Sequence, residues 1–193
     1  MYYQEPGGRI IENSYFDGRW TLDDHALVDG SVVTSDADAA SPLAAVSYQR
    51  DGRNFRQVFY ITALGEVMST YSTTASNNIA TSWSDSEKII DDPALAGSPA
   101  LAACTGAGLD GIFVYYPSNN GQGFLNEVRY HFSNESWAEG GWLEGSDPTS
   151  GVACSVYNSD DYSIVNVYWR NKATQRLQQS YVNFDSFDFN DGE

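Results

Sequence analysis

Histidine and cysteine are the residue types in this chain with the strongest potential for catalysis, and each occurs twice. His25 and His131 lie far apart in the sequence, and neither stands in a nucleophile motif such as Gly-x-Ser-x-Gly. Cys104 follows the apolar stretch Leu101-Ala-Ala, which opposes formation of a reactive thiolate. The sequence also contains no phosphate loop, zinc ligand set or redox motif. We therefore expect no cofactor, and these residues do not indicate an enzyme.

Carboxylates are abundant, with 26 Asp and Glu residues, but they form no recognisable catalytic or metal-binding pattern. A glycosidase needs two carboxylates at a fixed separation, and no such pair stands out in the sequence. The run at residues 188–192 departs from the spacing of a calcium loop and lacks its terminal Glu. The remaining acidic clusters are typical of solvated turns (Asp23-Asp24, Asp36/Asp38, Asp91-Asp92 and Asp160-Asp161). We expect no metal site.

The formal charge of −16 at pH 7 restricts the partners of this chain. An acidic surface repels the phosphates of nucleic acids and of anionic lipids, so we expect neither nucleic acid nor membrane as a partner. No apolar run approaches the roughly 18 residues of a membrane-spanning helix, and the start is not signal-like. The glycosylation sequon Asn134-Glu-Ser136 fits a secreted protein. We expect a secreted location, with a cytoplasmic one as the alternative.

Four aromatic pairs recur along the chain at steps of 57, 56 and 53 residues (Tyr2-Tyr3, Phe59-Tyr60, Tyr115-Tyr116 and Tyr168-Trp169). A small-residue segment precedes three of the pairs, a second aromatic follows each pair, and a Trp closes most units (Trp20, Trp83 and Trp142). Units of about 40–50 residues with four strands are typical of β-propeller blades. An ordinary β-sandwich is the alternative, because it also spaces short strands regularly.

The strand pattern agrees with a repeated β unit. Apolar and polar residues alternate over 55–61 and 164–169, which predicts strands there, and no window shows a sustained helical period. We predict an all-β chain in which residues 1–193 form a single β-propeller domain. Its four or so blade-like repeats are placed at approximately 1–40, 41–97, 98–149 and 150–193.

Cys104 and Cys154 occupy the same position in their repeats, where the first copy has Val46. Two buried thiols that behave as small apolar side chains are one interpretation. The other is a disulfide between adjacent inner strands, which requires Cα atoms closer than about 7 Å and an oxidising compartment.

The segment Tyr2-Tyr-Gln-Glu-Pro-Gly-Gly-Arg-Ile-Ile-Glu12 resembles a repeat of the fungal fucose-specific lectin family, a group of β-propellers. The strand Ser41-Pro-Leu-Ala-Ala-Val-Ser47 and the segment Gly140-Gly-Trp-Leu-Glu-Gly145 are also similar to that family. The resemblance covers essentially the whole chain in four copies. It implies a carbohydrate-binding protein with fucose-type sites between neighbouring blades.

In that family an Arg just before the aromatic pair, a Glu on the next strand and an aromatic wall hold each sugar. The resemblance places the Glu at Glu12 and Glu127, whereas Ser69 and Gln178 stand in the other two copies. The Arg position holds Gln57, Phe113 and Asn166. Arg56 is adjacent to it and would reach it only through a bulge, because neighbouring strand residues point to opposite faces.

The resemblance therefore gives two half-sites, Glu12 with Trp20 and Glu127 with Trp142, and adds Arg56 and Tyr116 as ligand-binding residues. A structural role is the alternative for each half-site, with the Trp packed between blades and the Glu at a surface turn. Phe113 and Asn166 make the remaining pockets more apolar than in the family. This favours, as a second function, binding or metal-free, non-hydrolytic conversion of a small molecule by positioning. A protein-docking propeller is a third.

The ends of the chain interrupt the repeat, since the first unit begins in its aromatic strand and the last has no clear Trp. Three arrangements satisfy this pattern: a small closed propeller, half of a dimeric ring, or a piece of a larger propeller. An isologous partner would bury the open edges, so we expect a homodimer.

Overall fold

The computed structural model describes residues 1–13, 15–16, 19–20, 32–75, 83–106, 108–120, 123–159 and 162–184. Within these ranges the chain forms strands and turns and no helix, so the all-β prediction is confirmed. The described part accordingly contains no helix long and apolar enough to cross a membrane. His25 and the acidic runs at 23–24, 160–161 and 188–192 lie outside the described residues.

The strands form four antiparallel sheets that follow chain order, and a separate two-stranded hairpin. The first sheet contains β1 (Tyr2–Gln4), β2 (Ile10–Glu12) and β5 (Val32–Thr34), and the hairpin contains β3 (Tyr15–Phe16) and β4 (Arg19–Trp20). The second sheet contains β6 (Ala44–Arg50), β7 (Arg53–Ile61), β8 (Val67–Ala75) and β9 (Glu87–Lys88). The third contains β10 (Ala102–Thr105), β11 (Gly111–Pro117), β12 (Leu125–His131) and β13 (Ser136–Leu143). The fourth contains β14 (Val152–Asn158), β15 (Ser163–Arg170) and β16 (Leu177–Phe184).

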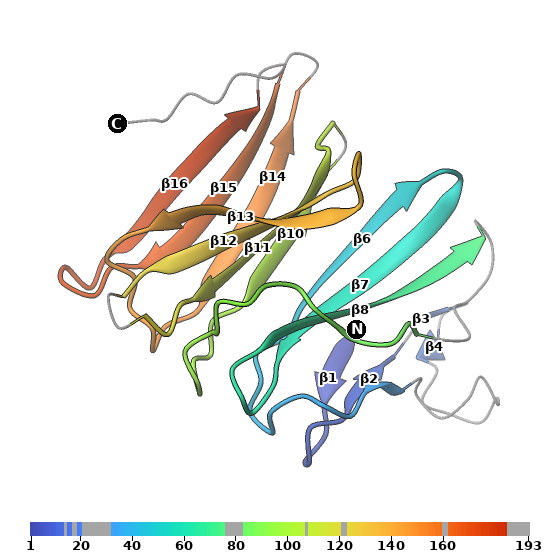
Figure 1. The fold of residues 1–193 in the computed structure, drawn as a ribbon. Coiled ribbons are helices and arrows are strands. Elements are labelled where there is room, and N and C mark those ends of the chain that lie inside the picture. Colours follow the sequence, from blue (N-terminus) through green and yellow to red (C-terminus); the bar gives the residue numbers. More distant parts are fainter. Residues whose placement is uncertain are drawn as a thin grey trace.

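The sheets succeed one another across the molecule, from β1 and β2 at one end to β14–β16 at the other (Figure 1). The leading strands of successive sheets adjoin, since β10 contacts both β6 and β14. Each sheet therefore presents one face to the sheet before it and one face to the sheet after it, as blades do.

The aromatic pairs explain how the sheets adhere, because neighbouring residues of a strand point to opposite faces. On β7, Tyr60 packs with the first sheet and Phe59 with the third. On β11, Tyr116 packs with the second sheet and Tyr115 with the fourth. All four rings are fully buried. Each of these two pairs thus sends one ring into each of two hydrophobic clusters. The core of the described residues consists of three such clusters, one between each two successive sheets.

Cys104 and Cys154 meet in the cluster between the third and fourth sheets, where both are free thiols. Cys104 lies on β10 and Cys154 on β14, the adjoining leading strands. A hydrogen bond with the Cys104 thiol and burial raise the pKa of Cys154 well above its ordinary value. A raised pKa lowers the fraction of reactive thiolate.

We expect the native protein at pH 8 to react with a thiol-alkylating reagent at least about tenfold more slowly than free cysteine, because each added pKa unit lowers the thiolate fraction about tenfold. Mass spectrometry of timed samples measures the rate, and the same reaction in denaturant is the control, where both thiols should react. Rapid labelling of Cys154 in the native protein would contradict the raised pKa.

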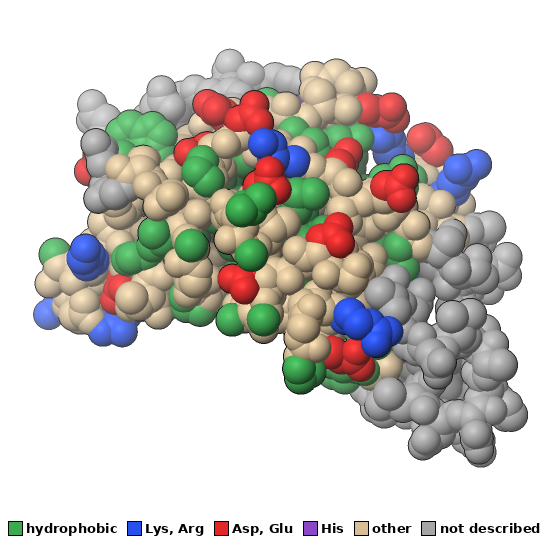
Figure 2. Space-filling model, turned by 60° about the horizontal axis from the view of Figure 1, so that its bottom comes forward, with side chains coloured by type: hydrophobic (Ala, Val, Ile, Leu, Met, Phe, Trp, Pro, Cys, Tyr) green, Lys and Arg blue, Asp and Glu red, His purple; other side chains and the backbone are tan. Residues whose placement is uncertain are grey.

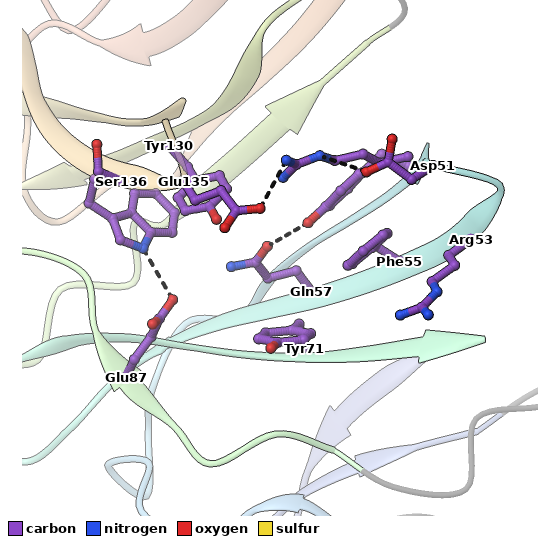
Figure 3. Close-up of a pocket in the computed structure, with 12 residues that line it drawn as sticks. Asp51, Arg53, Phe55, Gln57, Tyr71, Glu87, Tyr130, Glu135 and Ser136 are labelled. Carbon is purple, nitrogen blue, oxygen red and sulfur yellow. Dashed lines mark hydrogen bonds and ion pairs between the residues drawn. The ribbon is translucent and has the colours of Figure 1, made fainter. Parts of the chain in front are cut away.

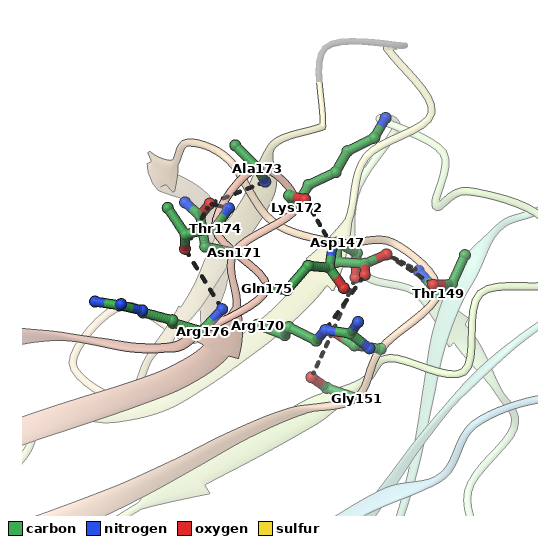
Figure 4. A network of polar contacts seen from close by, with 11 residues as sticks. Asp147, Thr149, Gly151, Arg170, Asn171, Lys172, Ala173, Thr174, Gln175 and Arg176 are labelled. Carbon is green, nitrogen blue, oxygen red and sulfur yellow. Dashed lines mark hydrogen bonds and ion pairs between the residues drawn. The ribbon is translucent and has the colours of Figure 1, made fainter.

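Polar turns connect the third and fourth sheets beyond the ends of their strands (Figure 4). The Asn171 side-chain oxygen accepts the backbone N–H groups of Ala173 (3.0 Å) and Thr174 (2.9 Å). The Asp147 carboxylate accepts the Thr149 hydroxyl (2.7 Å) and backbone N–H (3.1 Å), which lowers the Asp147 pKa. The Asp147 backbone N–H donates to the Arg170 carbonyl (2.8 Å). These contacts tie the turn after β15 to the segment that leads into β14.

Surface charge is dispersed on the face drawn in Figure 2, where acidic side chains lie in several separate places among hydrophobic and neutral ones. Exposed pairs such as Lys88–Asp91 (2.9 Å) raise the pKa of Lys88 and lower that of Asp91 through their hydrogen bond. Solvent screens such pairs, so they contribute little to stability. Burial between the sheets holds the fold.

Candidate functional site

A pocket of about 570 Å³ lies between the second and third sheets. Figure 3 shows its side chains projecting from both sheets toward a common space. The second sheet and its β6–β7 turn contribute Tyr48, Arg50, Asp51, Arg53, Phe55, Gln57, Tyr71 and Glu87, and the third sheet with its β12–β13 turn contributes Tyr130, Glu135, Ser136 and Trp137. A volume of several hundred Å³ is typical of small-molecule and sugar-sized ligands.

A chain of hydrogen bonds between polar side chains forms the inner wall of the pocket. Tyr48 Oη donates to Gln57 Oε1 (3.4 Å), and Gln57 Nε2 donates to Ser69 Oγ (3.1 Å). Ser69 Oγ donates to Glu87 Oε1 (3.3 Å), which also accepts the Trp137 Nε1 hydrogen (3.2 Å). Gln57 and Ser69 are buried, whereas Glu87 is exposed. The wall therefore joins β6 to β13 and ends in a carboxylate at the surface.

Aromatic rings flank this polar wall. Tyr48 and Phe55 stack with ring centroids 5.0 Å apart at an interplanar angle of 4°, and Tyr71 lies 6.4 Å from Phe55. From the third sheet, Trp137 lies 5.0 Å from Tyr130. Burial raises the pKa of both Tyr48 and Tyr130, so their phenols stay protonated and can donate at neutral pH. Flat ring faces with polar tips suit a ligand that has both hydroxyls and apolar C–H faces.

Arg50 crosses the rim of the pocket and links the two sheets. Its Nη2 pairs with Glu135 Oε1 (2.9 Å), its Nε lies 3.5 Å from Asp51 Oδ2, and its guanidinium lies 5.7 Å from the Phe132 ring centroid. Arg53 lies at the end of the pocket away from Glu87 (Figure 3). Among the described residues no group of three or more His, Cys, Asp or Glu side chains is placed to hold a metal ion. The lining offers hydrogen-bonding groups, aromatic rings and charged side chains of both signs.

Glu12 and Arg56 meet outside this pocket, between the first and second sheets. Arg56 Nη1 lies 2.7 Å from Glu12 Oε1, and Tyr2 Oη donates to the same oxygen (3.0 Å). Glu12 is only 7% exposed, and burial together with its charge raises the pKa of Tyr2. The register of β7 with β6 and β8 is continuous through Arg56, so no bulge or register shift turns its side chain to the face of Gln57. Arg56 instead points to the sheet opposite the one that Gln57 faces.

Glu127 is also enclosed, in the space between the third and fourth sheets. It accepts a hydrogen bond from Tyr115 Oη (2.5 Å) and forms an ion pair with Arg129 Nε. It is 6% exposed, and Gly140 makes room for it, because a Cβ at that position would collide with the carboxylate. Arg129 is the register partner of Phe113, and its guanidinium lies over the Phe113 ring. The third sheet thus has an Arg on β12, whereas the family pattern expects it on β11 at the position of Phe113.

The aromatic members of the predicted set are placed elsewhere. Trp142 is 58% exposed and its ring lies tilted by 33° against Phe124, with centroids 4.7 Å apart. It is the register partner of Asn126, which points away from the face of Glu127. Tyr116 is fully buried and donates to the Asp92 carbonyl (3.2 Å). Trp20 lies in β4, and its side chain is outside the described part of the chain. The structure thus brings together Glu12 and Arg56, and leaves Trp142 and Tyr116 apart from them.

The register also identifies which residues are equivalent across the sheets. The first member of each aromatic pair stands opposite the Glu position: Tyr2 opposite Glu12, Phe59 opposite Ser69 and Tyr115 opposite Glu127. In the fourth sheet Tyr168 stands opposite Gln179, so Gln179 is the equivalent residue in place of Gln178.

The carboxylates of Glu12, Glu127 and Glu87 differ in what compensates their charge. Glu12 is paired with Arg56 and Glu127 with Arg129, and both carboxylates are buried. Glu87 is held by the neutral donors Ser69 and Trp137 and is exposed. The charge of Glu87 therefore remains available to a ligand. The charges of Glu12 and Glu127 are neutralised by arginines of the same chain.

Sequence reasoning missed most of the pocket. In the sequence Gln57 is only a departure from the Arg of the family, and Glu87 lies in a strand of two residues that carries no periodic signal. Trp137 and Trp142 fall in the same strand, β13, so the sequence does not show which of them faces the pocket. One signal for the pocket is present in the sequence. Tyr48 and Phe55 are placed to face each other across a hairpin, and register partners lie on the same face of a sheet, so both rings belong to one face.

Comparison with known proteins shows that the fold of this chain is similar to that of solved lectin structures. No protein-family model and no curated protein sequence matches the chain. The fucose-specific lectin from Aleuria aurantia matches with a TM-score of 0.58 at 16% identity, over 97% of this chain and 56% of that chain. Two further structures of Aleuria aurantia lectin, one described as a six-bladed β-propeller and one a mutant in complex with alpha-methyl-L-fucoside, match at TM-scores of 0.41 and 0.42, with 17% identity, over 97% of this chain and 73% of theirs. This chain spans just over half the length of the first lectin structure. Its fold is a fucose-lectin-like β-propeller with about four blade-like sheets, so the propeller prediction is confirmed.

Proposed function

We propose that the protein binds carbohydrate in the pocket between the second and third sheets. The observation that carries the proposal is the pair Gln57 and Glu87, which the buried Ser69 links by hydrogen bonds, beside the rings of Tyr48, Tyr71 and Trp137. Amide, hydroxyl and carboxylate groups offer both donors and acceptors to sugar hydroxyls, and the rings pack on the apolar C–H faces. The likeness to a fucose-specific lectin supports the same class of ligand.

The pocket lacks the Arg and Glu that the family resemblance implies for a sugar site. Gln57 stands at the Arg position and Ser69 at the Glu position, while Glu87 from β9 supplies a carboxylate. Fucose is the first sugar to test, but the altered donors and acceptors call for a broad panel. The polar inner wall does not favour the alternative of an apolar pocket for a terpenoid or aromatic small molecule.

The test is a glycan array followed by titration of the strongest ligand with variants. We expect Trp137→Ala to weaken binding at least about tenfold, equivalent to about 1.4 kcal/mol, because it removes a ring and the N–H that orients Glu87. Trp142→Ala is the matched control and should leave binding unchanged, since Trp142 is exposed and outside the pocket.

Trp137 also contacts Phe59 edge-on at 5.9 Å, so a second variant guards against a folding effect. Tyr71 is 40% exposed and lines the pocket, and its replacement by alanine should weaken binding with little change in stability. Tyr181→Ala, at a 65% exposed position on β16, is the control. The proposal fails if the array shows no bound glycan, or if Trp142→Ala weakens binding while Trp137→Ala and Tyr71→Ala do not.

A further inference from the structure

We infer that the pocket between the second and third sheets prefers a sugar that carries a protonated amino group, and that this ammonium binds Glu87. The inference rests on the proposed function and specifies the class of sugar. It follows from the charge at Glu87, the rings beside it and the placement of the nearby cations.

Glu87 is the pocket carboxylate whose known contacts are neutral. Ser69 Oγ and Trp137 Nε1 both donate to its Oε1 atom, which fixes the carboxylate without cancelling its charge. Lys88, the next residue, points to the other side of β9 and is engaged by Asp91 (2.9 Å) and Glu66 (3.8 Å). A ligand cation would therefore meet a negative charge that is held in place and not neutralised by a neighbouring cation.

The surroundings of Glu87 also suit a cation. Trp137 Nε1 donates to the Glu87 carboxylate (3.2 Å), and the Trp137 ring lies 5.0 Å from the Tyr130 ring at an interplanar angle of 55°. An ammonium within about 6 Å of an aromatic face gains cation–π attraction in addition to the ion pair. The net charge of −16 attracts cationic ligands from solution and repels anionic ones.

The two pocket arginines do not occupy this place. The Arg50 guanidinium is held on the rim by Glu135 and Asp51. Arg53 lies at the opposite end of the pocket, on the side of Phe55 (Figure 3). A ligand with its ammonium on Glu87 and its hydroxyl oxygens toward Arg53 would match both ends, with the rings of Tyr48 and Phe55 between them. The pocket volume of about 570 Å³ leaves room for a disaccharide.

The experiment compares a β-1,4-linked glucosamine disaccharide with its N-acetylated counterpart by calorimetry at mildly acidic pH, where the amine is protonated. We expect the native protein to bind the amino form at least about tenfold more tightly. Glu87→Gln should remove this preference, because the amide keeps the shape and an acceptor oxygen but loses the charge. Glu144→Gln makes the same change in net charge at an exposed position outside the pocket and should retain the preference.

Putrescine, an amine without a sugar ring, and L-fucose complete the set of ligands. Equal affinity for the two disaccharides, or a preference that survives in Glu87→Gln, would overturn the inference and leave carbohydrate binding intact. Putrescine binding as tightly as the amino disaccharide would overturn the selection of a sugar. If no glycan binds in any form, the proposed function itself fails.

Discussion

We expect Glu12→Ala to lower the free energy of unfolding by about 3 kcal/mol, because it removes one partner of a buried ion pair. Arg56 would keep its charge between the first and second sheets, where its Nη2 atom is already buried without a hydrogen-bond partner among the described residues. The Tyr2 hydroxyl would lose its acceptor in the same change. Urea unfolding followed by tryptophan fluorescence measures the difference, provided that the slope of the transition is unchanged.

Two controls isolate the ion pair from the general cost of a substitution. Glu5→Ala breaks the exposed Arg9–Glu5 pair (3.2 Å), and should cost less than about 1 kcal/mol. The double variant Glu12→Ala/Arg56→Met should be more stable than the sum of its single changes predicts, by about 1 kcal/mol or more, because no charge is left buried. Additive single effects, or a Glu12→Ala cost no larger than that of Glu5→Ala, would show that the pair is not a structural element.

Tyr116→Ala should destabilise the protein by about 3–5 kcal/mol, since it removes a fully buried ring from the cluster between the second and third sheets. Tyr116→Phe keeps the ring and loses only the hydrogen bond to the Asp92 carbonyl, so its cost should be about 1 kcal/mol. Thermal unfolding monitored by circular dichroism compares the three proteins. The Tyr116→Phe variant should bind glycan as well as the native protein, and a loss of binding without a loss of stability would restore Tyr116 as a ligand-binding residue.

The sequence predicts the fold well because the information is local and repeated. The aromatic pairs of β7 and β11 each send one ring forward and one ring back, and in the two outer sheets Tyr2 and Trp169 face the neighbouring sheet. Alternation over 55–61 and 164–169 predicted strands that the structure contains as β7 and β15. A period that reflects the packing of one sheet on the next can be recognised without any knowledge of the ligand.

The candidate site is less predictable because its residues come from two sheets. Gln57 and Trp137 are 80 positions apart, and only the stacking of the sheets brings them together. The role of Arg56 depended on which face of β7 it occupies, and a one-residue shift reverses that face. Glu12 and Glu127 carry the family pattern in sequence, but the structure shows that internal cations already engage them.

The division of the core into three clusters has a consequence for how the protein opens. Each cluster is shared by only two sheets. The stability of the fold is therefore approximately the sum of the stabilities of the single sheets and of the interfaces between neighbouring sheets, as in repeat proteins. Loss of the cluster between the second and third sheets would uncouple the chain into two parts, whereas loss of the cluster beside the fourth sheet would release only one end. The protected amides of β7 and β11 should therefore exchange with solvent later than those of β15. The sheet interface that holds the candidate pocket is thus also the one that couples the first two sheets to the last two.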